Sequence, residues 1–201
     1  MAKNINLKTQ YSLKDDLQIL TLMTNRLVDY VRGDEIYGNQ GMFVSGLPVV
    51  TLGGILMRIR RLNALREHLT EASQMTLDSA ILQHDKAYQD WTHHYQNKLL
   101  AEAGSRVGRI EQFVQEYQDN PRSYEVAFEP EQTRRTIVQE ILYRMQSTNI
   151  ENTELLEQIK DVDASLKQIV TPSNFQWAEA LEEVYADDEF WWLYSTLQTA
   201  D

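Results

Sequence analysis

The chain contains no cysteine. This absence excludes disulfide bonds, thiolate metal ligands and a cysteine nucleophile, and it is typical of a cytoplasmic protein. Glycine and proline are also scarce. Six of the eight glycines and one of the four prolines lie in Gly33–Gly54, so only two glycines and three prolines lie elsewhere. The rest of the chain is therefore almost free of residues that interrupt helices, which predicts a largely helical protein.

Basic residues are outnumbered, with 19 lysines and arginines against 30 acidic residues and a net charge of −11. A nucleic-acid-binding protein needs a positive field over the phosphates, so we expect no nucleic acid partner. The length of 201 residues and the hydrophobic fraction of 42% fit a single helical domain over residues 1–201. The N-terminal residues show no apolar run of the kind found in a secretory signal.

One uncharged segment, Ile36–Met57, is long enough to span a bilayer. It contains five glycines and a proline, and its densest apolar part, residues 44–57, is shorter than the roughly 20 residues that a membrane helix needs. We therefore expect no membrane insertion. Residues 33–51 are instead predicted to form a glycine-rich apolar loop that packs over the bundle or contacts a partner. The partner-contact candidates in this loop are Met42, Phe43 and Val44.

Apolar residues recur at helical spacing in four segments, which predict helices over residues 12–32, 52–71, 76–118 and 131–170. Ser12 and Thr51 are typical N-cap residues for the first two helices. The two long patterns are separated by a connector with prolines at both ends, which indicates an antiparallel helical hairpin. Gly104 and Gly108 are candidate kinks in its first arm, and residues 147–149 are a candidate break in its second. The predicted fold is all-α: a helical bundle built on a long antiparallel helical hairpin, with an N-terminal helix pair and a short C-terminal helical element.

The C-terminal element, residues 173–198, is acidic and rich in aromatic residues, and no lysine or arginine follows Lys167. The densest basic cluster of the chain consists of Arg58, Arg60, Arg61 and Arg66. This cluster is predicted to receive the C-terminal element, to bind a phosphate or acidic partner from outside, or to form a solvated helix face. The partner-contact candidates in the C-terminal element are Trp177, Phe190, Trp191 and Trp192.

Polar residues interrupt the apolar faces of both long patterns. His84, Glu102 and Arg106 fall in line with core positions of the first arm, and Arg144, Thr148 and Glu151 do so on the second. An antiparallel hairpin places Arg106 near Tyr143 and Glu102 near Ser147, so the two interruptions are expected to meet. Isolated buried charge is expensive, so such a layer is a structural ion-pair device, an exposed zone where the helices splay, or a site for an anionic ligand. The ligand-binding candidates are Arg58, Arg61, Arg66, Glu102, Arg106 and Arg144.

Other site signals are weak. The segment Leu47–Gly54 resembles a strand and glycine turn before a helix, but it lacks the lysine and the glycine spacing of phosphate-binding loops. Asp90, His93 and His94 have helical spacing that allows two metal ligands on one face, yet no Glu-x-x-His or His-Glu-x-x-His motif is present. We predict no cofactor and no catalytic constellation.

Three functional hypotheses follow. The first is a non-enzymatic protein–protein interaction module, acting as a scaffold, adaptor or small regulator, with a protein partner or a homo-oligomer. The alternative is a small-ligand or anion-binding helical domain. The third is a metal-dependent enzyme on a helical bundle, which would use Asp90, His93 and His94.

Overall fold

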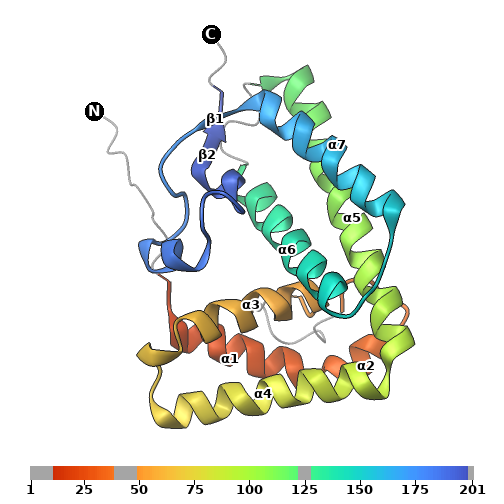
Figure 1. Ribbon diagram of the computed structural model, residues 1–201, viewed down its shortest axis with the longest axis vertical. Coiled ribbons are helices and arrows are strands. Elements are labelled where there is room, and N and C mark those ends of the chain that lie inside the picture. The colour runs from red at the N-terminus through yellow and green to blue at the C-terminus, as the bar shows by residue number, and fades with distance from the viewer. Residues whose placement is uncertain (1–10, 39–48, 122–127, 199–201) are drawn as a thin grey trace.

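The computed structural model describes residues 11–38, 49–121 and 128–198, which form an all-α bundle with one small two-stranded sheet (Figure 1). The predicted fold class is confirmed. The α helices are α1 (Leu13–Thr24), α2 (Leu27–Arg32), α3 (Leu52–Ala64), α4 (Glu71–Asp90), α5 (Thr92–Asp119), α6 (Phe128–Ser147) and α7 (Thr153–Ile169). The 3₁₀ helices are η1 (Arg66–His68), η3 (Glu179–Val184) and η4 (Trp191–Tyr194), and the strands are β1 (Val170–Pro172) and β2 (Ser195–Leu197).

Side-chain caps define where several helices begin. The Ser12 hydroxyl accepts a hydrogen bond from the Asp15 amide, and the Thr51 hydroxyl accepts one from the Gly54 amide. Asn152 caps α7 in the same way through the Leu155 amide. These bonds satisfy backbone donors that the first turn of a helix leaves without an intrahelical partner.

Each long helical pattern is divided into two helices. The first breaks at Trp91, whose backbone is non-helical, while Gly104 and Gly108 lie inside α5. The apolar pattern hides this break, because Tyr88 and Tyr95 lie seven residues apart and still pack together at the corner, with ring centroids 5.2 Å apart. The second pattern breaks after Ser147, where Asn149 adopts a left-handed backbone with φ 53°. The predicted helices 76–118 and 131–170 are therefore two helices each.

The break at Trp91 determines the architecture. It turns α4 away from α5, so that α4 lies along α1 at the base of the bundle while α5 rises beside α6 and α7 (Figure 1). Helix α3 lies between these two groups and contacts both α1 and α6.

Gly53, in the first turn of α3, permits the close approach of this helix to α5 and α6. A Cβ atom at Gly53 would lie 2.3 Å from Ile137 Cγ2 and 2.9 Å from Glu102 Oε1. Any larger residue would force these neighbours apart.

The C-terminal element folds back onto its own chain. Strand β2 pairs antiparallel with β1, which directly follows α7, in the register Val170↔Leu197. Between the strands, η3 contacts α3 and η4 contacts α6. The chain therefore closes one side of the bundle with this element, as Figure 1 shows.

Candidate functional site

The predicted arginine cluster lies where α3 meets the C-terminal element, and most of its members are paired with acids. The ion pairs are Arg58–Asp16 at 3.0 Å, Arg60–Glu140 at 2.7 Å and Arg66–Asp78 at 2.6 Å. Arg61 differs, because in the part of the chain that the structure describes no carboxylate lies within 4.0 Å of it. Within the described residues, Arg61 is thus the member of the cluster without an ion-pair partner.

Aromatic side chains of the C-terminal element hold Arg61 in place. Its Nε donates a 2.8 Å hydrogen bond to the Tyr185 hydroxyl, and its guanidinium lies 4.6 Å from the centroid of the Trp177 ring. Burial raises the pKa of Tyr185 to about 12, so its hydroxyl stays neutral at physiological pH. Stacking on an aromatic face and one hydrogen bond fix the orientation of a planar guanidinium.

A cavity of about 360 Å³ opens beside Arg61. Its wall is formed by the starts of α1 and α6, by α3 and by the C-terminal element. The lining residues are Tyr11, Ser12, Asp15, Asp16, Ile19, Met57, Arg58, Arg61, Glu129, Thr133, Trp177, Ala178 and Leu181. Three residues predicted from the sequence, Arg58, Arg61 and Trp177, therefore meet at one site.

Arg58, the second arginine that lines this cavity, is paired with an acid of the cavity wall. The Asp16 carboxylate pairs with Arg58 and accepts a 2.9 Å hydrogen bond from the Tyr11 hydroxyl, while Arg58 Nη1 donates to the Gly54 carbonyl at 3.0 Å. Burial lowers the pKa of Arg58, and the Asp16 carboxylate opposes that shift. The pair is internally neutral, so among the described residues that line this cavity Arg61 is the cation with no carboxylate within 4.0 Å.

Sequence reasoning missed Tyr11, Asp16 and Tyr185. A signal for Asp16 was present, because it lies beside Leu17 and Leu20 on the apolar face of α1 and is buried. An acid at such a position requires a cationic or hydroxyl partner. Nothing local to Tyr185 indicates its role, since its partner is 124 residues away in the chain.

Glu140, the partner of Arg60, gives the protein a pH-dependent stability. Burial raises the pKa of this carboxyl from 4.5 to about 6, and Arg60 opposes the shift. Between these pH values the folded state binds more protons than the unfolded state, so stability falls as the pH rises, by about 2 kcal/mol in total. Replacing Glu140 with glutamine removes this component. Urea unfolding of wild type and Glu140→Gln at about pH 4 and about pH 7.5 tests this expectation. If the difference in unfolding free energy between the two proteins is the same at both pH values, the expectation is wrong.

Glu102 and Arg106 form a buried ion pair at the start of α3. Arg106 Nε donates to Glu102 Oε1 at 2.9 Å, and Arg106 Nη2 donates to the Thr51 hydroxyl at 3.2 Å. Glu102 Oε2 accepts a 3.0 Å hydrogen bond from the Gly53 amide. The carboxylate thus occupies the amide end of α3 that a phosphate would need.

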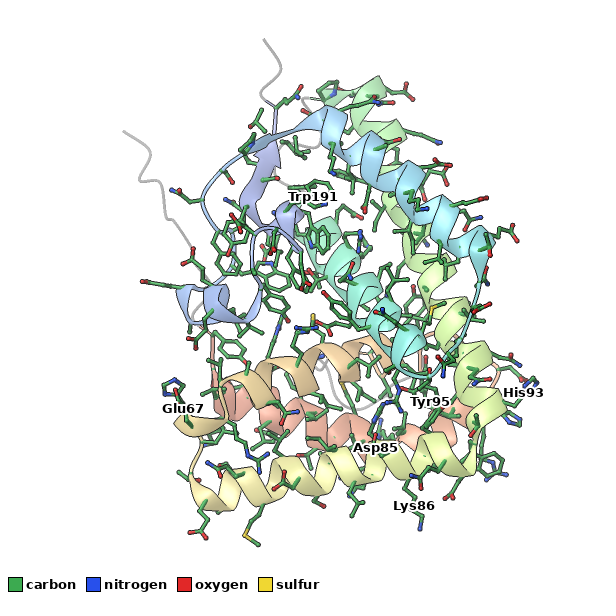
Figure 2. The ribbon with its side chains drawn as sticks, viewed as in Figure 1. Glu67, Asp85, Lys86, His93, Tyr95 and Trp191 are labelled. Carbon is green, nitrogen blue, oxygen red and sulfur yellow. The ribbon has the colours of Figure 1, made fainter. Side chains whose placement is uncertain are left out.

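Arg144 does not join this pair. Its guanidinium lies 4.5 Å from the Tyr88 ring centroid and 3.9 Å from the Asp85 carboxylate, near the corner between α4 and α5 where Figure 2 shows Asp85 and Tyr95. The same corner contains the His84 Nε2 contact to the Tyr95 hydroxyl at 2.7 Å, and burial raises the pKa of Tyr95. Glu102 and Arg106 take their partners from the first turn of α3, whereas Arg144 contacts Tyr88, Tyr95 and Asp85.

Three aromatic side chains predicted as partner contacts are buried in their own chain. Trp177, Phe190 and Trp192 are 8%, 0% and 1% exposed, and Trp191 is half-buried under Lys167. They would reach a partner only if the C-terminal element left the bundle. Met42, Phe43 and Val44 lie outside the described residues.

The weak metal candidates are separated by the helix break. Asp90 ends α4, whereas His93 and His94 are in the first turn of α5, so they do not share one helix face. All three are exposed, and Figure 2 shows His93 projecting away from the bundle. Within residues 11–38, 49–121 and 128–198, no three side chains are arranged to hold a metal ion.

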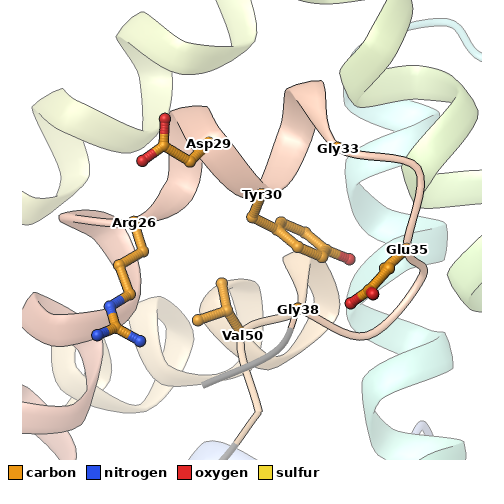
Figure 3. A pocket seen from close by; sticks show the side chains of 7 residues that line it. All are labelled: Arg26, Asp29, Tyr30, Gly33, Glu35, Gly38 and Val50. Atoms are coloured by element: carbon orange, nitrogen blue, oxygen red, sulfur yellow. The ribbon is translucent and has the colours of Figure 1, made fainter. Parts of the chain in front are cut away.

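A second cavity, of about 400 Å³, lies between α2 and the strand-like pair Gly38–Val50 (Figure 3). Its central side chain is Tyr30, whose hydroxyl donates to the Ile36 carbonyl at 2.5 Å. Lys98 lies 4.9 Å from the Tyr30 ring centroid and donates to the Gly33 and Glu35 carbonyls. These interactions are internal, and the charged residues that line the cavity are Arg26, Asp29 and Glu35.

Comparisons with family models, curated proteins and solved structures find no match. Among the described residues, none of the helices combines the length and the apolar character needed to cross a membrane.

Proposed function

We propose that this protein binds a small organic carboxylate in the cavity beside Arg61. The observation that carries the proposal is the state of the Arg61 guanidinium. It is fixed by Trp177 and Tyr185, and among the described residues it has no carboxylate within 4.0 Å, unlike its neighbours Arg58 and Arg60. A cation held in place before binding pays little ordering entropy when an anion arrives.

The lining of the cavity narrows the ligand class. Its volume of about 360 Å³ is within the range of roughly 300–1,000 Å³ that is typical of small-molecule sites. Ile19, Met57 and Leu181 supply apolar surface. Asp15 and Glu129 place two exposed carboxylates in the first turns of α1 and α6, which disfavour a multiply charged anion. We infer a monocarboxylate or a zwitterion with a compact apolar part.

A thermal-shift screen of amino acids and small monocarboxylates tests the proposal. A ligand at 100 times its dissociation constant adds about 2.7 kcal/mol of stability. Replacing Arg61 with glutamine is expected to weaken binding by about 10- to 100-fold, the usual effect of losing charge-assisted hydrogen bonds. Titration calorimetry of each variant measures this change.

The matched control is Arg60→Gln. Arg60 is adjacent on α3 but is paired with Glu140 and does not line the cavity. This variant is expected to lose stability and to keep the wild-type affinity. A wild-type protein that no carboxylate stabilises, or an Arg61→Gln variant that binds as tightly as wild type, contradicts the proposal.

Protein–protein interaction remains a second proposed function, and a different surface favours it. The aromatic residues of the C-terminal element are buried, but two large apolar side chains on α4 are not. Met75 is 68% exposed and Leu82 is 70% exposed.

A further inference from the structure

The outer face of α4 has an apolar ridge beside a groove. Met75 and Leu82 lie seven residues apart, which places them on the same face two turns apart. Next to this ridge, a groove of about 400 Å³ runs between α1 and α4. Its lining residues are Thr21, Thr24, Ala72, Met75, Thr76, Ser79, Ala80 and Gln83. Protruding side chains beside a groove lined by small residues suit the knobs-into-holes packing of two antiparallel helices.

We propose that α4 pairs antiparallel with α4 of a second copy of this chain. With the two-fold axis between Asp78 and Ser79, Met75 of one copy faces Leu82 of the other, and each leucine enters the groove of its partner. The same axis sets Glu71 opposite Lys86 of the second copy, twice by symmetry. One surface thus serves both copies, as an isologous interface requires.

The charges support a second copy as the occupant. Glu71 and Lys86 are both exposed, and within the described parts of the chain neither has an ion-pair partner within 4.0 Å. Figure 2 shows Lys86 projecting from α4 away from the bundle. Asp78, next to the axis, is bound by both terminal nitrogens of Arg66 at 2.8 and 2.6 Å, so two unpaired carboxylates do not meet there.

The size of the overlap predicts a weak dimer. From Glu71 to Lys86 the helix is about 22 Å long at 1.5 Å per residue. Such a contact is at the small end of specific interfaces, so we expect a dissociation constant of about 1 to 100 µM. The surface shares no lining residue with the Arg61 cavity, so the dimer goes beyond the ligand-binding proposal and stands or fails independently of it.

Analytical ultracentrifugation over a concentration series tests the dimer. Leu82→Lys is expected to raise the dissociation constant at least tenfold, because it sets a charge against Met75 of the second copy. Leu156→Lys on α7 is the control, since Leu156 is also an exposed leucine, and it is expected to leave the dimer unchanged. Circular dichroism establishes that each variant is folded.

A charge exchange identifies the partner and the orientation together. Glu71→Lys and Lys86→Glu are each expected to be monomeric alone, because each sets like charges opposite one another. Mixed together they are expected to form a heterodimer, since both facing pairs are then opposite in sign, and the double variant in one chain is expected to dimerise like wild type. A wild-type chain that stays monomeric up to about 1 mM, a dimer that persists in Leu82→Lys, or a mixture without heterodimer overturns the proposal.

Discussion

Replacing Glu102 with alanine is expected to destabilise the protein by about 3–5 kcal/mol, because it leaves a buried charge without compensation. Glu102 is fully buried and Arg106 is 9% exposed. The same change also removes the acceptor of the Gly53 amide at the start of α3. Urea unfolding of wild type and variant measures the loss, and a loss below about 1 kcal/mol contradicts this account of the pair.

Two further variants separate the charge from the packing. Replacing Glu102 with leucine and Arg106 with methionine together is expected to recover most of the loss, because a buried ion pair is often no better than apolar residues of similar size. A residual deficit of about 1 kcal/mol is expected from the unpaired Gly53 amide. Asp78→Ala is the control for an exposed ion pair, and it is expected to have little effect on stability because Asp78 is in solvent.

Replacing Trp192 with alanine is the second large change, with an expected loss of about 3–5 kcal/mol. The side chain is 1% exposed, its Nε1 donates to the Thr136 hydroxyl at 2.9 Å, and its ring lies 4.1 Å from the guanidinium carbon of Arg135. The substitution therefore opens a large cavity between α6 and the C-terminal element. Thermal and urea unfolding measure the effect.

The neighbouring Trp191→Ala is the matched control. Trp191 is half-buried and contacts Lys167, so its removal is expected to cost only about 1–2 kcal/mol. Equal losses in the two variants would show that the C-terminal element is not anchored through Trp192. Because Trp177 and Tyr185 of this element also hold Arg61, loosening it is expected to weaken carboxylate binding as well.

Composition alone supported the prediction that the arginine cluster receives the C-terminal element. An acidic, aromatic segment and a cluster of arginines attract one another through charge and cation–π contacts. The structure pairs them within one chain, since Arg60 lies 5.6 Å from the Phe190 ring centroid and Arg61 lies over Trp177. Sequence reasoning left open whether a second chain would take that place, and the folding-back of β2 onto β1 decides it.

For the polar residues on the apolar faces, the sequence indicated which residues need partners but not all of the partners. Glu102 and Arg106 were identified from their positions on an apolar face, and their mutual ion pair follows from i, i+4 spacing. The expected meeting with Arg144 assumed a particular register between α5 and α6. The apolar period within each helix does not fix that register, and Arg144 lies over the Tyr88 and Tyr95 rings at the corner between α4 and α5.

The amino-acid sequence alone determined the helical class, the starts of α1 and α3 at Ser12 and Thr51, and the polar residues that needed partners. These properties depend on spacing and on side-chain type within a few residues. Tertiary structure alone decided which arginines pair with carboxylates and which one is held by aromatic side chains. The Gly53 amide donates a hydrogen bond to Glu102, 49 residues away in the chain, and Arg61 donates one to Tyr185, 124 residues away. Such pairs depend on where helices turn and how closely they pack, and the break at Trp91 changes the distances between residues on its two sides.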